Sequence, residues 1–318
     1  MLLARYRLSQ APLGRLAAHV APTRLCWLVP DADPAPDTRL PPPMDSDHRN
    51  SGREKAANLV RHGATIYYWK RGLLLLAPTL VLDRPTSPLT ATLRIACREP
   101  YTIEVEGRSL RTRASLVAPR AERRRVVAIN SDIALFYFPL EMSEYSGLKD
   151  VLRGESLVDL PYAPFEPLLP ALRRAMTGEL PGDEARILID DAVQAITGRT
   201  APAIPARDSR IEKACQLIDV MPLDEVHLDT LAAQVHLSPS RLRELFKLQV
   251  GTTIGEYARW QSIWRMTNLW KEGVTFTDLA IEAGFHDLAH ADRVFLESFG
   301  ISPSSLIDSR YFKLVQCH

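Results

Sequence analysis

One motif occurs twice in the last third of this 318-residue chain, and the repeat constrains the fold more than any other feature. The first copy covers residues 228–246, and the second covers residues 276–295. Leu231 of the first copy aligns with Leu279 of the second. Each copy has the pattern of a short helix, a tight turn and a second helix, which is the helix-turn-helix arrangement.

The turns of both copies carry the residues that this arrangement needs. Ser238 can cap the second helix of the first copy, and Pro239 then occupies a first-turn position where a missing N–H costs nothing. Gly284 stands where the second copy must leave its first helix, a position that often has a positive φ. His236 holds the comparable place in the first copy. His290 is expected to cap or to pack, and not to bind a metal.

Residues 255–272 join the two copies with apolar residues at helix-like intervals, which predicts one long helix. An ordinary helical hairpin would explain a single copy. Two copies on one joining helix resemble the DNA-binding domain of the AraC/XylS family of transcription regulators. The resemblance covers residues 209–311, about a third of the chain. The residues that carry it are Gly284, Phe285, His290, Arg293, Phe295, Phe299, Gly300, Ser302 and Pro303.

The resemblance implies that the second helix of each copy enters a major groove of double-stranded DNA. Arginine suits a bidentate contact with guanine, and glutamate can accept a hydrogen bond from cytosine. The candidate contacts in the first copy are Ser238, Ser240, Arg241, Arg243 and Glu244. The candidate contacts in the second copy are Asp287, Leu288, Ala289, Asp292 and Arg293. The joining helix is expected to hold the two helices about 34 Å apart, facing successive major grooves.

The second copy departs from the family pattern. Ala289 stands where serine is typical, and Asp287 and Asp292 flank Arg293. We therefore expect the first copy to choose the bases and the second to position the protein on DNA. Residues 208–318 contain 11 Lys and Arg against 15 Asp and Glu, whereas a DNA-binding domain is usually basic. This charge predicts weak non-specific binding.

Strand-like runs occupy residues 64–138, and their spacing predicts a small antiparallel β barrel or jelly roll. The region resembles the cupin-type sensor domain that many members of the family carry. A small-molecule effector would bind there, with candidate ligand contacts at Tyr67, Trp69, Arg94, Tyr101 and Phe136. This set rests on alternation and on fold analogy alone.

A cupin enzyme would need a metal site, and the β region does not offer one. No histidine lies between His62 and His227, so the region lacks the His ligands for iron or zinc. We therefore expect no metal, no cofactor and no enzymatic activity. The basic run at residues 120–125 could receive an anionic ligand, but a charged, solvated strand edge is the favoured interpretation.

The sequence predicts an α+β multidomain protein. An amino-terminal cupin-like antiparallel β barrel with a helical pair precedes an all-α domain with two helix-turn-helix motifs joined by a long helix. The predicted segments are a flexible leader at 1–55, a β sensor domain at 56–142, a helical dimerisation segment at 143–197, a linker at 198–207 and a DNA-binding domain at 208–318. The last segment is expected to fold alone, and the full chain is expected to form a homodimer through the segment at 143–197.

Composition favours the cytoplasm. The four cysteines show no C-x-x-C spacing, which is typical of incidental thiols in a reducing compartment. The longest apolar run, residues 72–82, contains Pro78 and is too short to cross a bilayer. We therefore expect no membrane association.

The leading hypothesis is a sequence-specific DNA-binding transcription regulator. It would act as an activator, contacting RNA polymerase subunits, and its amino-terminal domain would sense an effector or mediate dimerisation. The alternative is a non-catalytic protein–protein interaction module whose helical repeats do not bind DNA. Salt-dependent affinity for promoter DNA separates the two, because phosphate contacts release counterions.

Overall fold

The protein is described by a computed structural model that covers residues 63–69, 72–199, 207–269, 274–303 and 312–317. The predicted leader at 1–55 and most of the predicted linker at 198–207 lie outside these residues. All the described residues belong to one compact unit, Asp47–His318.

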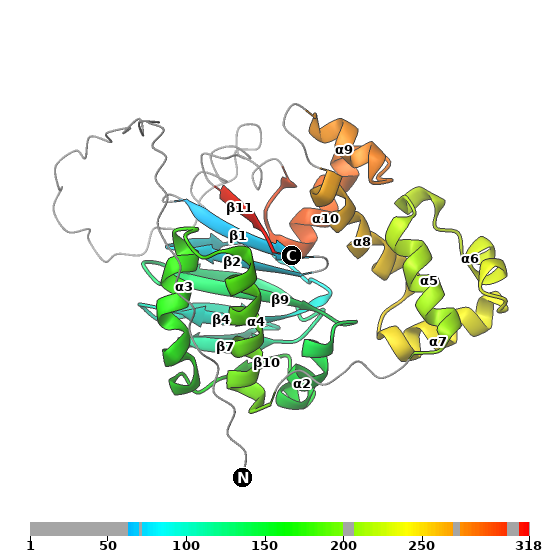
Figure 1. Ribbon diagram of the computed structural model, residues 1–318. Helices are drawn as coiled ribbons and strands as arrows, with labels where there is room; N and C mark the ends of the chain where they lie inside the picture. Colours follow the sequence, from blue (N-terminus) through cyan, green and yellow to red (C-terminus); the bar gives the residue numbers. More distant parts are fainter. Residues whose placement is uncertain (1–62, 70–71, 200–206, 270–273, 304–311, 318) are drawn as a thin grey trace, which may run out of the picture. The chain divides into compact units, whose positions relative to one another are not determined.

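Two β-sheets form the amino-terminal part (Figure 1). The seven-stranded sheet has the order β10-β7-β4-β9-β2-β1-β11, with β1 at Ala64–Trp69, β2 at Gly72–Ala77, β4 at Thr90–Ala96, β7 at Ala114–Val117, β9 at Ile133–Pro139, β10 at Leu157–Asp159 and β11 at Phe312–Gln316. The four-stranded sheet has the order β3-β8-β5-β6, with β3 at Leu80–Leu82, β5 at Tyr101–Val105, β6 at Arg108–Thr112 and β8 at Arg123–Ala128. Every pairing between these strands is antiparallel except that of β1 with β11.

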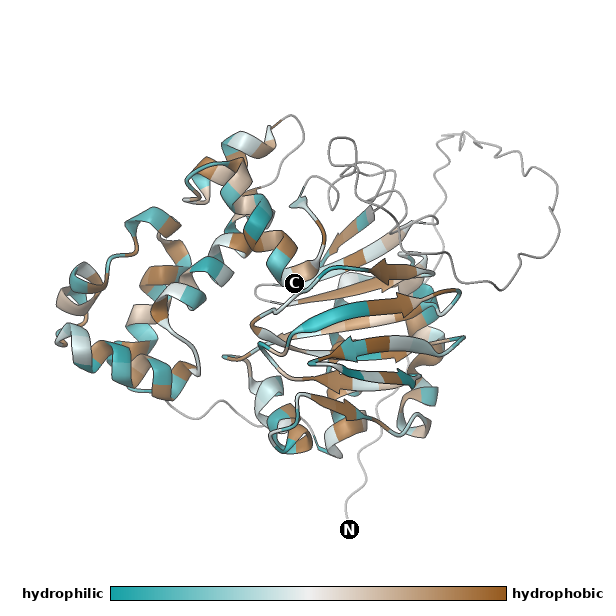
Figure 2. Cartoon of the chain, turned by 180° about the vertical axis from the view of Figure 1, so that it is seen from behind, coloured by the Kyte–Doolittle hydropathy of each residue, from teal (hydrophilic) through white to brown (hydrophobic). Residues whose placement is uncertain are grey.

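Period-2 alternation decides which side chains face which layer. Along β9, Leu135 and Tyr137 pack with Ile103 of the four-stranded sheet. Phe136 and Phe138, the residues between and after them, pack instead with the helices. The central strands of the seven-stranded sheet are therefore buried on both faces, which explains why β2 and β9 are almost wholly apolar. Figure 2 shows apolar and polar residues mixed along the other strands.

Helices cover the outer face of the seven-stranded sheet (Figure 1). They are α2 at Ser143–Leu152, the 3₁₀ helix η1 at Ala163–Leu168, α3 at Leu169–Met176 and α4 at Gly182–Thr197. The helical segment that we predict to mediate dimerisation uses much of its apolar surface in this packing, since Leu172, Leu188 and Ala192 are fully or almost fully buried. Ile187 of α4 is the exception, with 60% of its surface exposed.

The carboxy-terminal helices confirm the predicted pair of helix-turn-helix motifs on a long joining helix. They are α5 at Ser209–Val220, η2 at Leu223–Glu225, α6 at Leu228–Gln234, α7 at Pro239–Val250, α8 at Ile254–Leu269, α9 at Phe276–Glu282 and α10 at Leu288–Phe299. The first motif, α6–α7, has its own core with α5 and the start of α8, centred on Leu231, Phe246 and Tyr257. The second motif, α9–α10, shares its core with the two sheets.

The chain end requires a correction to the predicted boundary at residue 318. Strand β11 pairs in parallel with β1, from Ala64 opposite Phe312 to Tyr68 opposite Gln316. The Cys317 N–H also donates to the Tyr68 carbonyl at 2.8 Å. The reason is that β1 would otherwise be an edge strand with unpaired backbone groups. Residues 312–317 therefore belong to the β part and not to the helical domain.

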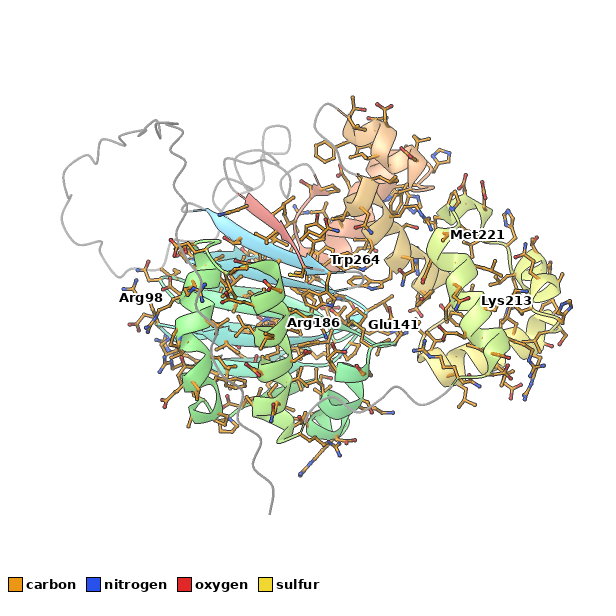
Figure 3. All side chains as sticks on the ribbon, viewed as in Figure 1. Arg98, Glu141, Arg186, Lys213, Met221 and Trp264 are labelled. Atoms are coloured by element: carbon orange, nitrogen blue, oxygen red, sulfur yellow. The ribbon has the colours of Figure 1, made fainter. Side chains whose placement is uncertain are left out.

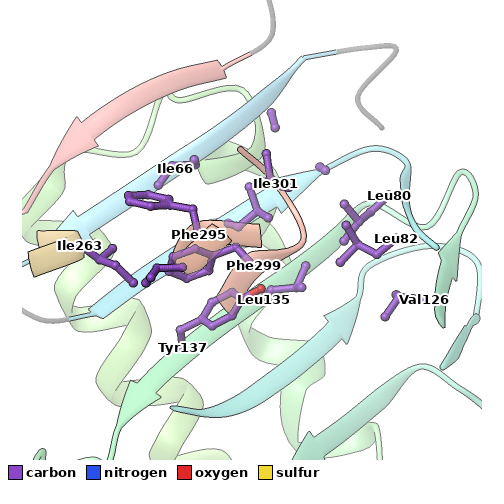
Figure 4. Packing of buried hydrophobic residues seen from close by; sticks show 14 of the residues in the cluster. Ile66, Leu80, Leu82, Val126, Leu135, Tyr137, Ile263, Phe295, Phe299 and Ile301 are labelled. Atoms are coloured by element: carbon purple, nitrogen blue, oxygen red, sulfur yellow. The ribbon is translucent and has the colours of Figure 1, made fainter. Parts of the chain in front are cut away.

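The second helix-turn-helix motif, part of the segment 208–318 that we expect to fold alone, packs against the sheets. Phe295 and Phe299 of α10 pack among Ile66, Leu135 and Tyr137 of the sheets (Figure 4). The rings of Phe299 and Tyr137 meet edge to face, with centroids 5.5 Å apart. Trp264 of α8 lies in the same cluster (Figure 3). The apolar core of the second motif is thus continuous with that of the two sheets.

Candidate nucleic-acid interface

Helix α7 begins as its sequence predicts. The Ser238 hydroxyl accepts from the Arg241 N–H at 3.3 Å, which satisfies one of the donors left free at a helix start. Pro239 follows in the first turn. His236 has φ of 55° in the turn before it, the left-handed conformation expected at that place. The cap and the turn fix the direction in which α7 leaves α6.

The outward face of α7 carries the predicted contacts. Ser240, Arg241, Arg243 and Glu244 are exposed, while Leu242, Leu245 and Phe246 face the core. Arg241 is not free, because its Nη1 donates to the Glu244 Oε2 at 2.8 Å. Arg243 forms no hydrogen bond or ion pair with any other described residue. Of the two arginines, Arg243 can therefore reach a base without breaking a contact.

Helix α10 presents fewer free groups than its sequence suggested. Asp287 is the amino-terminal cap, and its Oδ1 accepts from the His290 N–H at 2.6 Å. This hydrogen bond is the main reason why the pKa of the Asp287 carboxyl lies below its usual value. A hydrogen bond with the His286 side chain lowers the pKa further. A carboxylate kept charged in this place would repel a phosphate. Asp287 is accordingly better explained as a cap than as a DNA contact.

The other predicted residues of α10 also divide by exposure. Ala289 and Arg293 are exposed, whereas Leu288 and Asp292 are half-buried. The Asp292 Oδ1 is buried with no donor among the described residues, and burial raises the pKa of this carboxyl. The His290 ring packs edge to face on Phe285, with centroids 5.3 Å apart, which is the packing role expected of it.

Arg265 of the joining helix is a structural residue that sequence reasoning missed. Its Nη2 donates to the carbonyls of Ile218 at 3.1 Å and Asp219 at 3.0 Å, near the end of α5. Its Nη1 approaches the Ala283 carbonyl at 3.5 Å, in the turn of the second motif. A cation is favourable at a helix carboxy terminus, so Arg265 links α5, α8 and the second turn. The position of a charged arginine within the joining helix was the sequence signal that could have indicated this structural role.

The five candidate ligand residues of the β part do not form one site. Tyr67, Trp69 and Phe136 face the covering helices, and the Tyr67 hydroxyl donates to the Leu180 carbonyl at 2.9 Å. Arg94 and Tyr101 lie instead between the sheets. Arg94 pairs with Leu135 in the β4–β9 register, and Leu135 and Tyr101 belong to the core between the sheets.

The basic run at residues 120–125 is split by the fold. Arg124 and Arg125 are exposed, but β8 lies between β3 and β5 and is therefore not the strand edge that we expected. Arg123 is buried between the sheets. Arg120 reaches the start of α8, where its Nη2 donates to the Glu256 Oε2 at 3.0 Å and to the Thr252 hydroxyl at 2.8 Å. The hydrogen bond from the Arg120 guanidinium is the main cause that lowers the pKa of Glu256 to about 2. Hydrogen bonds from Thr253 and Thr252 contribute less.

The described part of the chain holds no cluster of three or more His, Cys, Asp or Glu placed to bind a metal. None of its helices is both long enough and apolar enough to span a bilayer.

The sequence similarity of this chain to known proteins includes the carboxy-terminal helical part. Residues 231–309 match a family described as a helix-turn-helix domain. The chain is similar to the arabinose operon regulatory protein of Salmonella typhimurium, with 35% identity over 103 residues that make up 31% of this chain and 36% of that protein. The protein of the same name from Escherichia coli is 32% identical over 102 residues, 31% of this chain and 35% of that protein. The chain thus spans about a third of the length of the curated relatives it matches.

A similarity to a solved structure extends further along the chain. ToxT from Vibrio cholerae superposes over 71% of this chain and 92% of its own, with 12% sequence identity and a TM-score of 0.43.

Proposed function

We propose that the chain is a DNA-binding transcription regulator of the AraC/XylS type and that it reads operator DNA through α7 and α10, a proposal supported by the helix-turn-helix match and by the similarity to two arabinose operon regulators. The observation that supports this most strongly is the pair of helix-turn-helix motifs fixed on the single helix α8. A module built only for protein–protein contact has no need of two capped helices with exposed arginines. Families of this kind are regulators and not enzymes, and no catalytic role is proposed.

Helix α7 supplies the base selectivity in this proposal. Arg243 is exposed and has no hydrogen-bond partner among the described residues, and its guanidinium can donate two hydrogen bonds to one guanine edge. Ser240 and the Arg241–Glu244 pair flank it on the same face. Helix α10 contributes Arg293 as a phosphate contact, with Ala289 beside it. Phosphate contacts fix the register of a protein on DNA but carry no sequence information.

The β part is proposed to be the sensor. Phe295 and Phe299 of α10 pack against residues of the sheets. A rearrangement between the sheets would therefore change the position of the second DNA-binding motif. The backbone bond from the Ser87 N–H to the Glu297 carbonyl, 2.9 Å long, adds a polar link of the same kind. We further propose that the β part binds a small-molecule effector and that the chain forms a homodimer. The protein would act in the cytoplasm as an activator that contacts RNA polymerase subunits.

The experiment begins with selection of bound sequences from a random double-stranded DNA library by the full-length protein. The selected sequence is then labelled, and its affinity is measured by fluorescence anisotropy at several salt concentrations. We expect enrichment of a motif with two elements about one DNA turn apart, and an affinity that falls as salt rises. Absence of any enriched motif would favour the protein–protein alternative.

A further inference from the structure

The Arg265 side chain lies where the two helix-turn-helix motifs meet. Its Nη2 donates to the carbonyls of Ile218 and Asp219 in the last turn of α5, at 3.1 Å and 3.0 Å. Its Nη1 donates to the carbonyl of Ala283, directly after α9, at 3.5 Å. Carbonyls at a helix end have no partner within their own helix, and a cation is favourable there. Neither α5 nor α9 has a basic residue in its last turn, so Arg265 of α8 supplies the cation for both.

The connection between α5 and α6 makes a second contact with the second motif. The Leu223 N–H, at the start of η2, donates to the Ala283 carbonyl at 3.4 Å. The Leu223 side chain packs against the core of the first motif and also against the core that the second motif shares with the sheets. Leu223 therefore joins the two apolar cores.

Gly284 shows how closely the two motifs approach. A methyl group added to Gly284 would overlap the Leu223 nitrogen and would lie 2.7 Å from the Pro222 carbonyl carbon. The φ of 84° already favours glycine at this place, and the adjoining backbone excludes a side chain for a second reason. The α5–α6 connection and the turn of the second motif thus fit together backbone to backbone.

The joining helix alone does not fix the angle between the two motifs, because each motif packs on a different stretch of it. The first motif packs on the start of α8 around Tyr257, and the second packs on later turns around Trp264. A rotation of either motif about the α8 axis would move α10 around the DNA relative to α7. The direct contacts at Arg265, Leu223 and Gly284 oppose this rotation.

We propose that Arg265 and Leu223, with Gly284 opposite them, form a lock between the two motifs that sets which spacing of the two operator elements the protein accepts. Arg265 and Leu223 are positioning residues, because they hold α7 and α10 in place through other groups. This inference rests on the proposed DNA-binding function and specifies what determines the operator geometry. Two base pairs inserted between the elements rotate one of them by about 70° around the duplex, since one turn contains about 10.5 base pairs. Locked motifs cannot follow that rotation, whereas hinged motifs can.

The test measures the affinity of the full-length protein for its selected operator with zero, one or two base pairs inserted between the two elements. For the unmodified protein we expect the longest insertion to weaken binding by about tenfold or more. Arg265→Met should reduce that loss to about threefold or less and leave the base preference of each element unchanged. Arg259→Met removes the same charge from an exposed position on α8 and should keep the steep spacing dependence. An even loss of affinity at every spacing for Arg265→Met would assign Arg265 a purely structural role and overturn the proposal.

Leu223→Ala tests the lock from its other side. This variant keeps the charge of the protein and every hydrogen bond of Arg265, and it should also flatten the spacing dependence. Far-UV circular dichroism checks that each variant is folded. A steep spacing dependence in folded Leu223→Ala would contradict the role given to this residue.

The distance between the motifs provides a readout that needs no DNA. Nitroxide labels at Leu248→Cys on α7 and Ile281→Cys on α9, both at exposed positions, report this distance by double electron–electron resonance. The background carries Cys26→Ser, and the other three cysteines are buried. We expect one narrow distance distribution, which Arg265→Met broadens and Arg259→Met leaves narrow. A distribution that Arg265→Met leaves unchanged would overturn the lock.

These measurements separate the failure of the lock from failure of the DNA-binding proposal. If the unmodified protein selects no operator, the DNA-binding proposal fails, and the role of the lock in operator spacing fails with it. If an operator is selected and its spacing dependence is the same for the unmodified protein and Arg265→Met, the lock alone is overturned.

Discussion

Arg243 and Arg293 occupy comparable helices in different surroundings. Arg243 is exposed beside Ser240 and has no partner within the described part of the chain, whereas Arg293 lies near the charged cap Asp287. Arg243→Ala should relax base preference in one half of the operator and weaken binding by about 1–3 kcal/mol. Arg293→Ala should weaken binding evenly across sequences. Anisotropy titrations of both variants against single-base operator changes check this, and an exchange of the two behaviours would contradict the ranking of the helices.

The Arg120–Glu256 pair makes a second prediction at the scale of single residues. Hydrogen bonds, first that from Arg120, hold the pKa of Glu256 at about 2 in the folded protein, below the ordinary value of 4.5. The stability that Glu256 contributes is therefore complete above about pH 4.5 and is lost as pH falls towards 2. Glu256→Gln should therefore be less stable than the unmodified protein at pH 7, with a difference that shrinks between pH 4.5 and pH 2.

Urea unfolding at several pH values measures that difference. The pair is partly exposed, so the effect should be modest, on the order of 1 kcal/mol. Glu122→Gln provides a control, because Glu122 pairs with the exposed Arg124 within the same segment. An equal difference for Glu256→Gln at pH 7 and pH 3 would show that its carboxylate does not contribute through its charge.

At the scale of elements, β11 makes the most direct prediction. Removing residues 312–318 would leave β1 as an edge strand, with its backbone groups and the side chain of Tyr68 open to solvent. We expect the truncated protein to lose stability and to aggregate on heating more readily than the full chain. Light scattering during a thermal ramp measures this. Unchanged melting and scattering would mean that the β1–β11 pairing contributes nothing.

Local chemistry explains how much of the fold could be read from the sequence. Ser238, Pro239 and Gly284 mark the turns of both motifs through their own backbone preferences, so these elements were predictable. The return of β11 to β1 depends on two segments at opposite ends of the chain, and no local pattern reports such pairing.

The candidate ligand site shows the same division between local and long-range information. Alternation placed Arg94 and Tyr101 in strands, but their location between the sheets depends on which face the helices cover. Arg123 lies in a run that looks solvated, and only a β-bulge and the opposing sheet bury it. The burial of Arg123 against β4, where it donates to the Thr92 hydroxyl, was therefore not identifiable from the sequence.

At the scale of the whole molecule, assembly is the next question. Most apolar side chains of α3 and α4 pack on the sheet, which leaves Ile187 as the large apolar side chain exposed on α4. A homodimer through α4 should therefore be sensitive to Ile187→Glu, whereas the exposed Ile129→Glu, in the β part, should not affect it. Sedimentation velocity at tens of micromolar protein checks this. A monomer under these conditions, with and without DNA, would rule out the dimer.

The central claim is that the two motifs on α8 bind DNA by sequence. The most direct measurement is the affinity of the full-length protein for its selected operator and for a scrambled duplex, each across a series of salt concentrations. The account predicts operator binding at least about 10³-fold tighter than scrambled binding, with both affinities falling as salt rises. Equal affinities for the two duplexes, or no salt dependence, would contradict it.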